Sequence, residues 1–418
     1  MKNLTLSDDL KWRGQIKDTT FIDLDWINKP RTFYLGTDCS SDSLTVGNLA
    51  VYMVARQLID HGWKAIMLVG GATSLVGDPG GKESERELKS KEEIEHNVQS
   101  VAKQVEQIVG KGHFTYVNNI DWFKSINYLD FLRDVGKHYS MTELLQRDFV
   151  STRIGEGGSG ISYAEFSYSL IQGYDYWHLF KKYGVELQIG GSDQWGNMLS
   201  GVPLIRKKEN KEVHALSTPL IVNKSTGKKF GKSEDGAIWL DSKKTSVYSF
   251  YQFWLNIDDD SAKEYLKIYS DITKNEYDDL LHEFSKNPGQ RIIQKRLAYD
   301  VTKLIHGINQ VKSTMLATNI LFGETPVTSM TKESLEILQQ ELPLVKIKKQ
   351  STYIDVLEQA GIASSKSEAR RLLDQNAISA NNEKINVHSS VKDIKPVLGS
   401  YQIVKRGKNM FTVLEIIE

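Results

Sequence analysis

Residues 31–71 read RTFYLGTDCSSDSLTVGNLAVYMVARQLIDHGWKAIMLVGG and carry the clearest structural pattern in the chain. The apolar runs 31–35 and 64–69 predict buried strands, and apolar residues at helical spacing between them predict a helix that ends near Gly62. A strand, a helix and a second strand followed by glycines form the repeating unit of a parallel sheet covered by helices. The sequence therefore predicts an α/β fold.

Similar signals continue along the chain. Ser90 and Glu93 form a capping box before apolar residues spaced alternately by four and three, so a helix is predicted up to Gly110. Residues 187–189 are a further apolar run that leads into a Gly-Gly pair. In open α/β sheets, ligands bind beyond the carboxyl ends of the strands, and we expect the functional site there.

Composition limits the class of protein. The 418 residues are 40% hydrophobic and 25% charged, which is typical of a globular chain of two or three domains. Basic and acidic residues both number 53, so the whole molecule is not a polycation that coats nucleic acid. The single cysteine, Cys39, cannot form an internal disulfide, and residues 1–14 lack the apolar core of a secretory signal. No apolar stretch approaches 18 residues, so we expect no membrane partner. The expected location is the cytoplasm, with an organelle matrix as the alternative.

The C-terminal part of the chain has a different composition. Residues 322–330 contain Gly, Pro and hydroxyl residues and are the best candidate for a linker. Residues 344–418 contain 12 basic and 8 acidic residues, although the whole chain is neutral. A short hairpin is predicted around Asn381 and Asn382. Before it, a predicted helix brings three basic residues near one face, namely Lys366, Arg370 and Arg371.

Three polar clusters follow predicted strands. Residues 34–48 combine glycines with the start of a helix, whose free N–H groups can bind phosphate. Residues 70–86 form a glycine-rich loop with Lys82 and Arg86, which can clamp an anionic leaving group. Residues 224–233 hold four lysines that can follow charge developing on a polyphosphate. From the residues alone, each cluster has an alternative interpretation without function. It is a capped turn for residues 34–48, a solvated loop for residues 70–86 and a solvated turn for residues 224–233.

Other patterns are interpreted as structural. Residues 155–160 match G-x-G-x-x-G, but the preceding residues are too polar for a core strand, so we interpret them as a connector. The loop around Lys82 is not a P-loop, because Glu83 stands where Ser or Thr is required. The histidines lack metal-ligand spacing and have no partner cysteines, so no protein-bound metal is expected.

Five motifs, taken in order, resemble those of the bacterial-type tyrosyl-tRNA synthetases, which are class I aminoacyl-tRNA synthetases. They are residues 34–48, residues 69–86, FSYSLIQGYD at 166–175, QIGGSDQWGN at 188–197 and KFGKS at 229–233. The basic tail from about Gln350 resembles the S4-like RNA-binding module that ends the chains of this family. The resemblance therefore covers nearly the whole sequence.

The resemblance implies a division into four parts. They are a Rossmann-like catalytic domain with an inserted helical segment (1–222), a KFGKS-loop and helical domain (223–321), a linker (322–349) and a small α+β S4-like domain (350–418). It also implies L-tyrosine, ATP and tRNA(Tyr) as partners, Mg²⁺ on the ATP phosphates, and a homodimer. The implied reaction joins tyrosine to ATP with release of pyrophosphate, and then transfers tyrosine to the 3′ end of the tRNA. Catalysis would rest on positioning and on stabilising charge.

The resemblance also implies roles for individual residues. The phenol of tyrosine is bound by Tyr34 and Asp175, and its ammonium group by Tyr168, Asp78 and Gln172. The adenylate is lined by Asp38 and Gln194, and the ribose is bound by Asp193. Backbone contacts to the nucleotide come from Gly36, Gly47 and Gly191. The pyrophosphate is embraced by Lys82, Arg86, Lys229, Lys232 and Ser233, and RNA is contacted by Lys366, Arg370 and Arg371.

The chain departs from the family pattern in one catalytic motif. Thr45-Val46-Gly47-Asn48 stands where the signature reads His-Ile-Gly-His, and Ser40 replaces the commoner Thr. Thr45 and Asn48 can donate hydrogen bonds to phosphate and ribose, but they cannot carry positive charge. Thr45 leaves open one alternative, a synthetase-like RNA-binding protein that has lost activation. The enzyme alternative is a tryptophanyl-tRNA synthetase, which shares the scaffold of this class. The pair Tyr34 and Asp175 favours a phenol over an indole.

Overall fold

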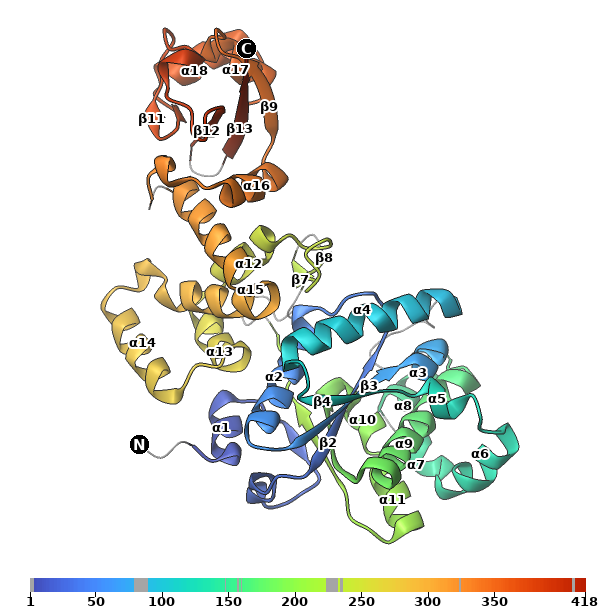
Figure 1. Cartoon of the computed structure of the whole chain (residues 1–418). Coiled ribbons are helices and arrows are strands. Elements are labelled where there is room, and N and C mark those ends of the chain that lie inside the picture. The colour runs from blue at the N-terminus through green and yellow to red at the C-terminus, as the bar shows by residue number, and fades with distance from the viewer. Residues whose placement is uncertain are drawn as a thin grey trace. The chain divides into compact units, whose positions relative to one another are not determined.

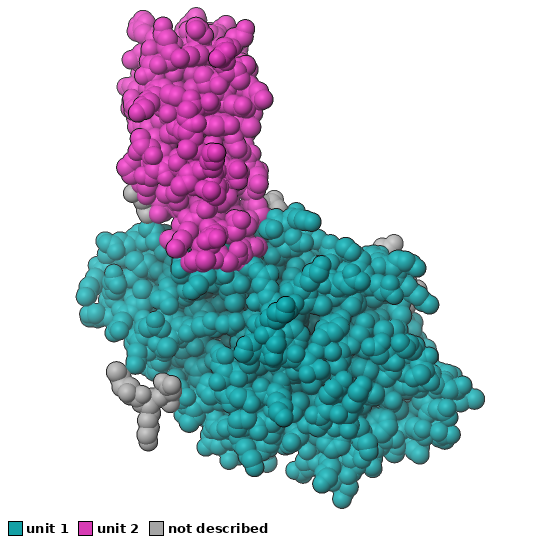
Figure 2. All heavy atoms as spheres, viewed as in Figure 1, with its two compact units in different colours: residues 1–245, 254–305 teal, residues 246–253, 306–418 magenta. Residues whose placement is uncertain are grey.

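The computed structural model describes the chain except for residues 1–3, 79–88, 147, 156–157, 159, 223–231, 234–235, 323–324 and 408–409; of Asp148, Phe149, Lys232 and Ser233 it describes the backbone alone. The chain divides into two compact units, residues 1–245 with 254–305, and residues 246–253 with 306–418 (Figure 2). The four-part division given above stays a prediction.

The first unit is built around a six-stranded sheet, which confirms the predicted α/β class (Figure 1). Its strands, in spatial order, are β1 (Asp18–Thr19), β6 (His214–Thr218), β5 (Val185–Gly191), β2 (Thr32–Asp38), β3 (Lys64–Gly70) and β4 (Phe114–Asn118). All neighbours are parallel except β1, which runs antiparallel to β6. The central strand β2 lies between β3 and β5, so three carboxyl ends meet at one edge of the sheet.

Helices surround this sheet. They are α1 (Leu6–Arg13), α2 (Val46–Asp60), α3 (Gly71–Val76), α4 (Lys91–Val109), α5 (Ile120–Phe123), α6 (Tyr128–Asp134), α7 (Met141–Leu145), α8 (Asp148–Ile154), α9 (Tyr163–Tyr183), α10 (Trp195–Met198) and α11 (Gly201–Glu209). Local signals set several of their ends. Ser90 Oγ accepts from Glu93 N at the start of α4, and Gly110 follows its last residue, as predicted.

The start of α9 is fixed by a buried ion pair. Arg153 donates to both carboxylate oxygens of Glu165 at 2.7 and 3.0 Å, and its Nε donates to Gly160 O at 2.7 Å. Glu165 also completes a capping box with Ser162. This pair ties the predicted connector to the helix that carries Tyr168 and Asp175.

A helical region follows the sheet. It comprises the hairpin strands β7 (Lys232–Ser233) and β8 (Gly236–Ala237) and the helices α12 (Val247–Leu255), α13 (Asp259–Tyr269), α14 (Lys274–Lys286) and α15 (Ile292–Phe322). The long helix α15 is interrupted at Gly307, whose φ of 85° lies in the left-handed region. The first unit takes residues 254–305 of this region, and the second unit takes residues 246–253 and the part of α15 that begins at His306.

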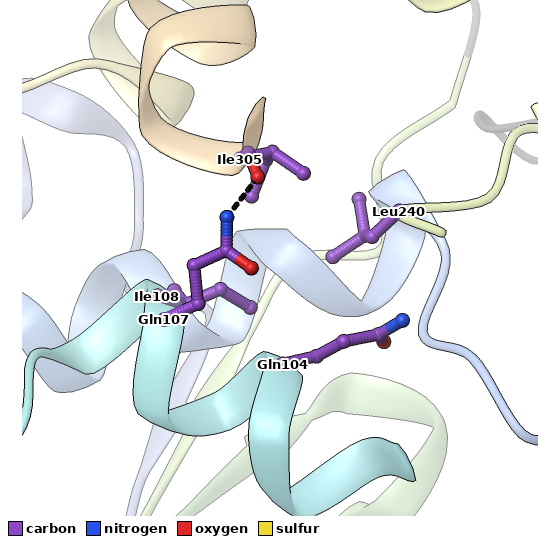
Figure 3. A pocket seen from close by; sticks show the side chains of 5 residues that line it. All are labelled: Gln104, Gln107, Ile108, Leu240 and Ile305. Carbon is purple, nitrogen blue, oxygen red and sulfur yellow. Dashed lines mark hydrogen bonds between the residues drawn. The ribbon is translucent and has the colours of Figure 1, made fainter. Parts of the chain in front are cut away.

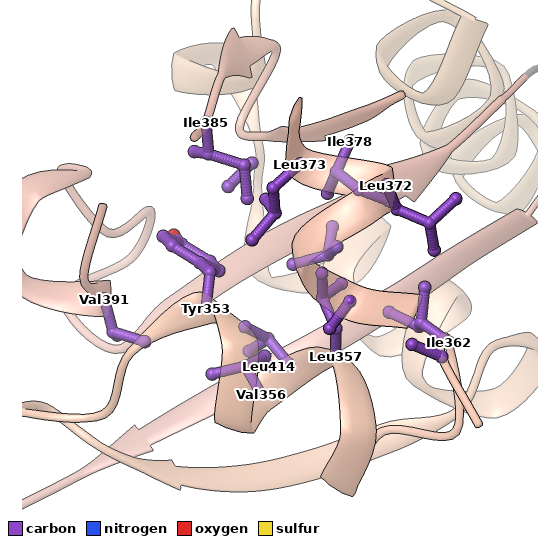
Figure 4. Packing of buried hydrophobic residues seen from close by; sticks show 14 of the residues in the cluster. Tyr353, Val356, Leu357, Ile362, Leu372, Leu373, Ile378, Ile385, Val391 and Leu414 are labelled. Carbon is purple, nitrogen blue, oxygen red and sulfur yellow. The ribbon is translucent and has the colours of Figure 1, made fainter. Parts of the chain in front are cut away.

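The second unit holds a small α+β domain, as predicted. Its sheet has the order β11 (Glu383–Lys384), β10 (Ile378–Ala380), β12 (Tyr401–Arg406), β13 (Met410–Ile417) and β9 (Leu344–Lys348). The helices are α16 (Lys332–Glu341), α17 (Tyr353–Gln359) and α18 (Lys366–Asp374). Tyr353, Leu357 and Leu373 pack in a core between α17, α18 and the sheet (Figure 4). The predicted hairpin is present, since Asn381 and Asn382 adopt positive φ between β10 and β11.

Across the described ranges, none of the helices is both long and apolar enough to cross a membrane.

Candidate active site

The candidate site lies at the carboxyl ends of β2, β3 and β5. Asp38, Gly70 and Gly191 end these strands, and Asp38 is paired in register with Gly70. A Cβ atom on Gly70 would lie 2.1 Å from Thr73 Oγ1 and 2.5 Å from Asp38 Oδ1. A glycine is therefore needed at the end of β3, because any side chain would separate these two groups.

Asp38 is held by two hydroxyl groups. Thr73 Oγ1 donates to Oδ1 at 2.6 Å, and Tyr168 OH donates to Oδ2 at 2.7 Å. Burial, reinforced by the charge of Asp38, raises the pKa of Tyr168. The predicted adenylate residue Asp38 and the predicted ammonium residue Tyr168 are thus in direct contact.

Asp175 lies two turns further along α9 and is buried. Its carboxyl oxygens accept from Trp122 Nε1 at 2.9 Å and from Asn119 Nδ2 at 3.1 Å. Burial raises the pKa of Asp175 to about 8, although both donors oppose the shift. Asn119 Nδ2 also donates to Thr73 Oγ1 at 3.3 Å, so hydrogen bonds connect Asp175 to Asp38 through Asn119 and Thr73.

Tyr34 is 1% exposed, and its ring lies 5.2 Å from that of Tyr176. Its hydroxyl has no hydrogen-bond partner in the described part of the chain. Burial, and then the charge of Asp175, raises the pKa of Tyr34. A hydroxyl buried without a partner costs about 1–3 kcal/mol in protein mutational data. The site thus holds an unpaired hydroxyl and a buried carboxyl, which together can satisfy the donor and the acceptor of a phenol.

A further cluster joins two predicted residues. Asp78 is buried and accepts from Gln194 Nε2 at 2.5 Å and from Asn197 Nδ2 at 3.2 Å. Asn197 Nδ2 also donates to Gln194 Oε1 at 3.1 Å. Gln172 lies half-buried on α9 between Tyr168 and Asp175. The predicted tyrosine-binding side chains therefore come from β2, from α9, from the segment after α3 and from the turn after β5.

Thr45 caps the start of α2. Its N and Oγ1 both donate to Asn48 Oδ1, at 3.0 and 2.9 Å, so the amide nitrogen of Asn48 points away from Thr45. Asn48 is exposed, Gly47 lies in the first turn of α2, and Ser40 is exposed in the preceding segment. A helix of this length presents free N–H groups and a positive dipole end to an anion.

The remaining predicted nucleotide residues are placed as follows. Gly36 is exposed although the three residues before it in β2 are buried, and Asp193 is exposed in the turn after β5. A Cβ on Gly191 would lie 2.7 Å from Asp193 Oδ1. The predicted pyrophosphate groups Lys82, Arg86 and Lys229 lie outside the described residues. The backbones of Lys232 and Ser233 form β7, which pairs with β8.

Four residues of the network were not identified from the sequence, namely Thr73, Asn119, Trp122 and Asn197. Asn119 and Trp122 follow the edge strand β4, in which Val117 is the one buried residue, so its apolar pattern is weak. The polar pair Asn118-Asn119 at the end of this strand was the available signal. No group of three histidine, cysteine or carboxylate side chains suited to a metal ion occurs among the residues that the structure describes.

In the second unit, the three basic residues named above lie exposed on α18. Lys366 Nζ donates to Asp355 Oδ1 at 2.7 Å, which raises the pKa of Lys366. The guanidinium groups of Arg370 and Arg371 make no hydrogen bond or ion pair within the described part of this unit and are exposed, so they can reach an external anion.

Residues 27–323 match the family of class I tRNA synthetases for tryptophan and tyrosine. The chain belongs to this family. Residues 334–414 match the tyrosine–tRNA ligase SYY-like C-terminal domain. The tyrosine–tRNA ligase of Bacteroides thetaiotaomicron is 39% identical, with 97% of this chain and 98% of that protein aligned. The tyrosine–tRNA ligase of Anaeromyxobacter dehalogenans strain 2CP-1 is 41% identical over 93% of each chain.

Solved structures agree with this assignment to the synthetases. A C-terminally truncated mitochondrial tyrosyl-tRNA synthetase of Aspergillus nidulans is 30% identical with a TM-score of 0.69, covering 77% of this chain and 95% of that chain. A tryptophanyl-tRNA synthetase of Encephalitozoon cuniculi is 12% identical with a TM-score of 0.54, covering 79% and 91%, and it shows the shared fold alone. The predicted family and the predicted enzyme class, tyrosine–tRNA ligase, are confirmed. The substrates of this synthetase are accordingly tyrosine, ATP and tRNA.

Proposed function

We propose that tyrosine is activated at the carboxyl edge of the six-stranded sheet and is then transferred to tRNA(Tyr). In the first step, a carboxylate oxygen of tyrosine attacks the α-phosphorus of ATP and pyrophosphate leaves. In the second step, a ribose hydroxyl of the 3′-terminal adenosine attacks the tyrosyl carbonyl and AMP leaves. The observation that carries this proposal is the buried, unpaired hydroxyl of Tyr34 beside the buried carboxyl of Asp175.

Tyr34 and Asp175 would bind the phenol. A phenolic O–H is both a donor and an acceptor, and these two groups can satisfy both functions. An indole N–H is a donor only, so tryptophan would leave one of the two buried groups unpaired. The pair therefore supports tyrosine over tryptophan as the substrate.

Three acceptors would hold the ammonium group of the substrate. Tyr168 OH already donates to Asp38, so its oxygen is free to accept, and Asp78 supplies a buried carboxyl. Gln172 lies between them on α9 and would supply its amide oxygen. Gln194, which hydrogen-bonds Asp78, and Asp38 would line the tyrosyl and adenylate moieties.

The start of α2 would bind the nucleotide. The amide nitrogen of the exposed residue Asn48 and the N–H groups of the first turn can donate to phosphate and ribose, while Thr45 keeps Asn48 in place. Ser40, Gly36, Gly47 and Gly191 would allow close contact with the nucleotide, and Asp193 would accept from the ribose hydroxyls. ATP would enter as its magnesium complex, with the metal on the phosphates.

The pyrophosphate would be drawn away by cationic groups. The side chains proposed for this role are Lys82, Arg86, Lys229, Lys232 and Ser233. Contacts that strengthen as negative charge moves onto pyrophosphate lower the barrier without tightening the ground state. Their role rests on the family resemblance.

We also propose a cytoplasmic homodimer that binds tRNA through α18. Several large apolar side chains are exposed along α6 to α9, which supports a self-association surface there: Tyr128, Leu129, Met141, Ile154 and Tyr163. Sedimentation equilibrium of the whole chain measures this, with a dimer expected. In the tail, Lys366, Arg370 and Arg371 would contact phosphates of the tRNA.

Pyrophosphate exchange tests the proposed function. Labelled pyrophosphate is incubated with ATP, Mg²⁺, the purified chain and one amino acid at a time. We expect exchange with tyrosine and none with tryptophan. Exchange with tryptophan alone would assign the other substrate of the family, and binding of RNA without any exchange would mean that activation is lost.

A further inference from the structure

The start of α2 is held by a side chain from a different helix. Gln104, near the middle of α4, accepts from Leu44 N through its Oε1 at 2.7 Å and donates from its Nε2 to Ser43 Oγ at 3.0 Å. Ser43 and Leu44 are 5% and 2% exposed, so these bonds are shielded from water. They fix the two residues that come directly before Thr45.

Ser43 is also bonded to a third segment. Its Oγ accepts from Asp241 N at 3.2 Å and donates to Leu44 O at 2.9 Å. The backbone continues this pairing, since Leu240 N donates to Leu44 O at 2.9 Å and Val46 N donates to Ile238 O at 3.1 Å. Thr45 forms a β-bridge with Trp239 between these bonds. The segment 238–241 is thus paired along the start of α2.

This segment leads directly back to the lysine motif. Ala237, the residue before Ile238, is paired in register with Lys232 in the β7–β8 hairpin. The backbones of Thr45 and Lys232 therefore pair with positions two residues apart on the same segment, Trp239 and Ala237. Lys244 adds a second tie between the same segments, because it pairs with Asp42 and lowers the pKa of that carboxyl.

The surroundings leave Gln104 little freedom. Gln104 and Gln107 project from α4 beside a cavity whose other lining residues are Ile108, Leu240 and Ile305 (Figure 3). Its volume is about 10 Å³, which is room for one water molecule at most. Gln107, one turn further along the helix, donates to Ile305 O and makes no contact with Ser43 or Leu44 in the described structure. The two glutamines thus share a helix and a cavity but differ in their partners.

We propose that Gln104 is a positioning residue for tyrosine activation, an inference that rests on the proposed function. Through Ser43 it holds the start of α2 and the segment 238–241 in one arrangement, which keeps Thr45 and Asn48 in place for the nucleotide. Gln104 touches neither tyrosine-binding cluster in the described structure. Its loss should therefore slow the chemical step and leave the binding of tyrosine unchanged.

The test compares Gln104→Leu with Gln107→Leu in the full chain. For Gln104→Leu we expect the rate of tyrosyl-adenylate formation to fall roughly tenfold, corresponding to about 1.4 kcal/mol in the activation free energy. The KM for tyrosine should stay within about twofold, since the phenol and ammonium groups are unaffected. Transfer from preformed adenylate to tRNA should keep the parental rate, because pyrophosphate has already left. Gln107→Leu should match the parent in every measurement.

Two further variants keep the proposal testable if Gln104→Leu does not fold. Gln104→Glu keeps the acceptor for Leu44 N but loses the donor to Ser43, and Ser43→Ala removes the shared hydroxyl. Both should slow adenylate formation by a few-fold with tyrosine binding intact. The proposal is overturned if these folded variants form tyrosyl-adenylate at the rate of the parent. It is also overturned if Gln104→Leu and Gln107→Leu lose the same activation rate, or if the transfer of tyrosine to tRNA slows as much as adenylate formation. The unmodified chain is measured first. If it shows no tyrosine-dependent pyrophosphate exchange, the proposed function itself is refuted. If it is active and the variants are unaffected, only the role of Gln104 is refuted.

Discussion

Replacing Tyr34 by phenylalanine removes one oxygen atom from the interior of the site. In the free protein this oxygen is buried and unpaired within the described structure, at a cost of about 1–3 kcal/mol. The Tyr34→Phe variant without substrate should therefore gain roughly 1 kcal/mol in its free energy of unfolding. Most substitutions of buried side chains have the opposite sign.

The same change should weaken the choice of substrate. With tyrosine bound, the hydroxyl of Tyr34 gains a partner, and a neutral hydrogen bond contributes about 0.5–1.5 kcal/mol. With phenylalanine bound, the hydroxyl stays unpaired, so its removal favours phenylalanine. The ratio of kcat/KM for tyrosine over phenylalanine should fall roughly tenfold, which corresponds to about 1.4 kcal/mol. Asp175 remains in the variant, so tyrosine should stay the preferred substrate.

Tyr52 provides a matched control for both measurements. It is 2% exposed, but its hydroxyl is hydrogen-bonded to Thr37 Oγ1 at 2.6 Å. Tyr52→Phe should therefore lose about 1 kcal/mol in urea unfolding, because Thr37 is left without its partner, and selectivity should be unchanged. Unfolding at neutral pH and pyrophosphate exchange with both amino acids measure these effects. The reasoning is refuted if Tyr34→Phe is less stable than the parent, or if its selectivity equals that of the parent.

Two other predictions concern charge. The pKa of Asp175 is about 8 in the folded chain, against an ordinary value of 3.8. Between these two pH values the folded chain keeps a proton that the unfolded chain has lost. The free energy of unfolding therefore falls as the pH rises through this window. Between about pH 4 and 7 the free energy of unfolding should fall by up to about 4 kcal/mol. In urea unfolding, Asp175→Asn should remove this dependence on pH. An unchanged dependence on pH in the variant would contradict the raised pKa of Asp175. Arg370→Ala and Arg371→Ala should each raise the KM for tRNA. Each should also reduce, by about one, the slope of log binding constant against log salt concentration, and leave pyrophosphate exchange unaffected. Equal losses in pyrophosphate exchange and in tRNA charging would mean that α18 is a structural element.

Features governed by neighbours in the sequence could be predicted. The ends of α4 follow from Ser90 and Gly110, because a capping side chain and a glycine act on the residues beside them. The hairpin at Asn381 and Asn382 follows in the same way, since asparagine tolerates positive φ. The order of strands and glycines likewise predicted that Asp38, Gly70 and Gly191 end neighbouring parallel strands at one edge of the sheet.

Contacts between distant segments could not be predicted. Nothing near Asp38 in the sequence indicates that its two oxygens accept from Thr73 and Tyr168, which lie 35 and 130 residues away. Gln104 is a similar case, because a glutamine in an amphipathic helix ordinarily marks the solvated side. Its role becomes visible only when α4 is packed against the start of α2.

Burial separates the site into two groups of residues with different consequences for substitution. Asp175 and Tyr168, which are proposed for tyrosine, are buried and hydrogen-bonded to other protein groups, so a polar atom left unpaired there is costly. Substitutions there should change selectivity and stability together. Asn48 and Asp193, which are proposed for the nucleotide, are exposed, and water can replace their partners when substrate is absent. Substitutions of Asn48 and Asp193 should leave the free energy of unfolding nearly unchanged and lower the rate of tyrosine activation. Measuring both quantities for variants at each position of the site tests this division into buried and exposed groups.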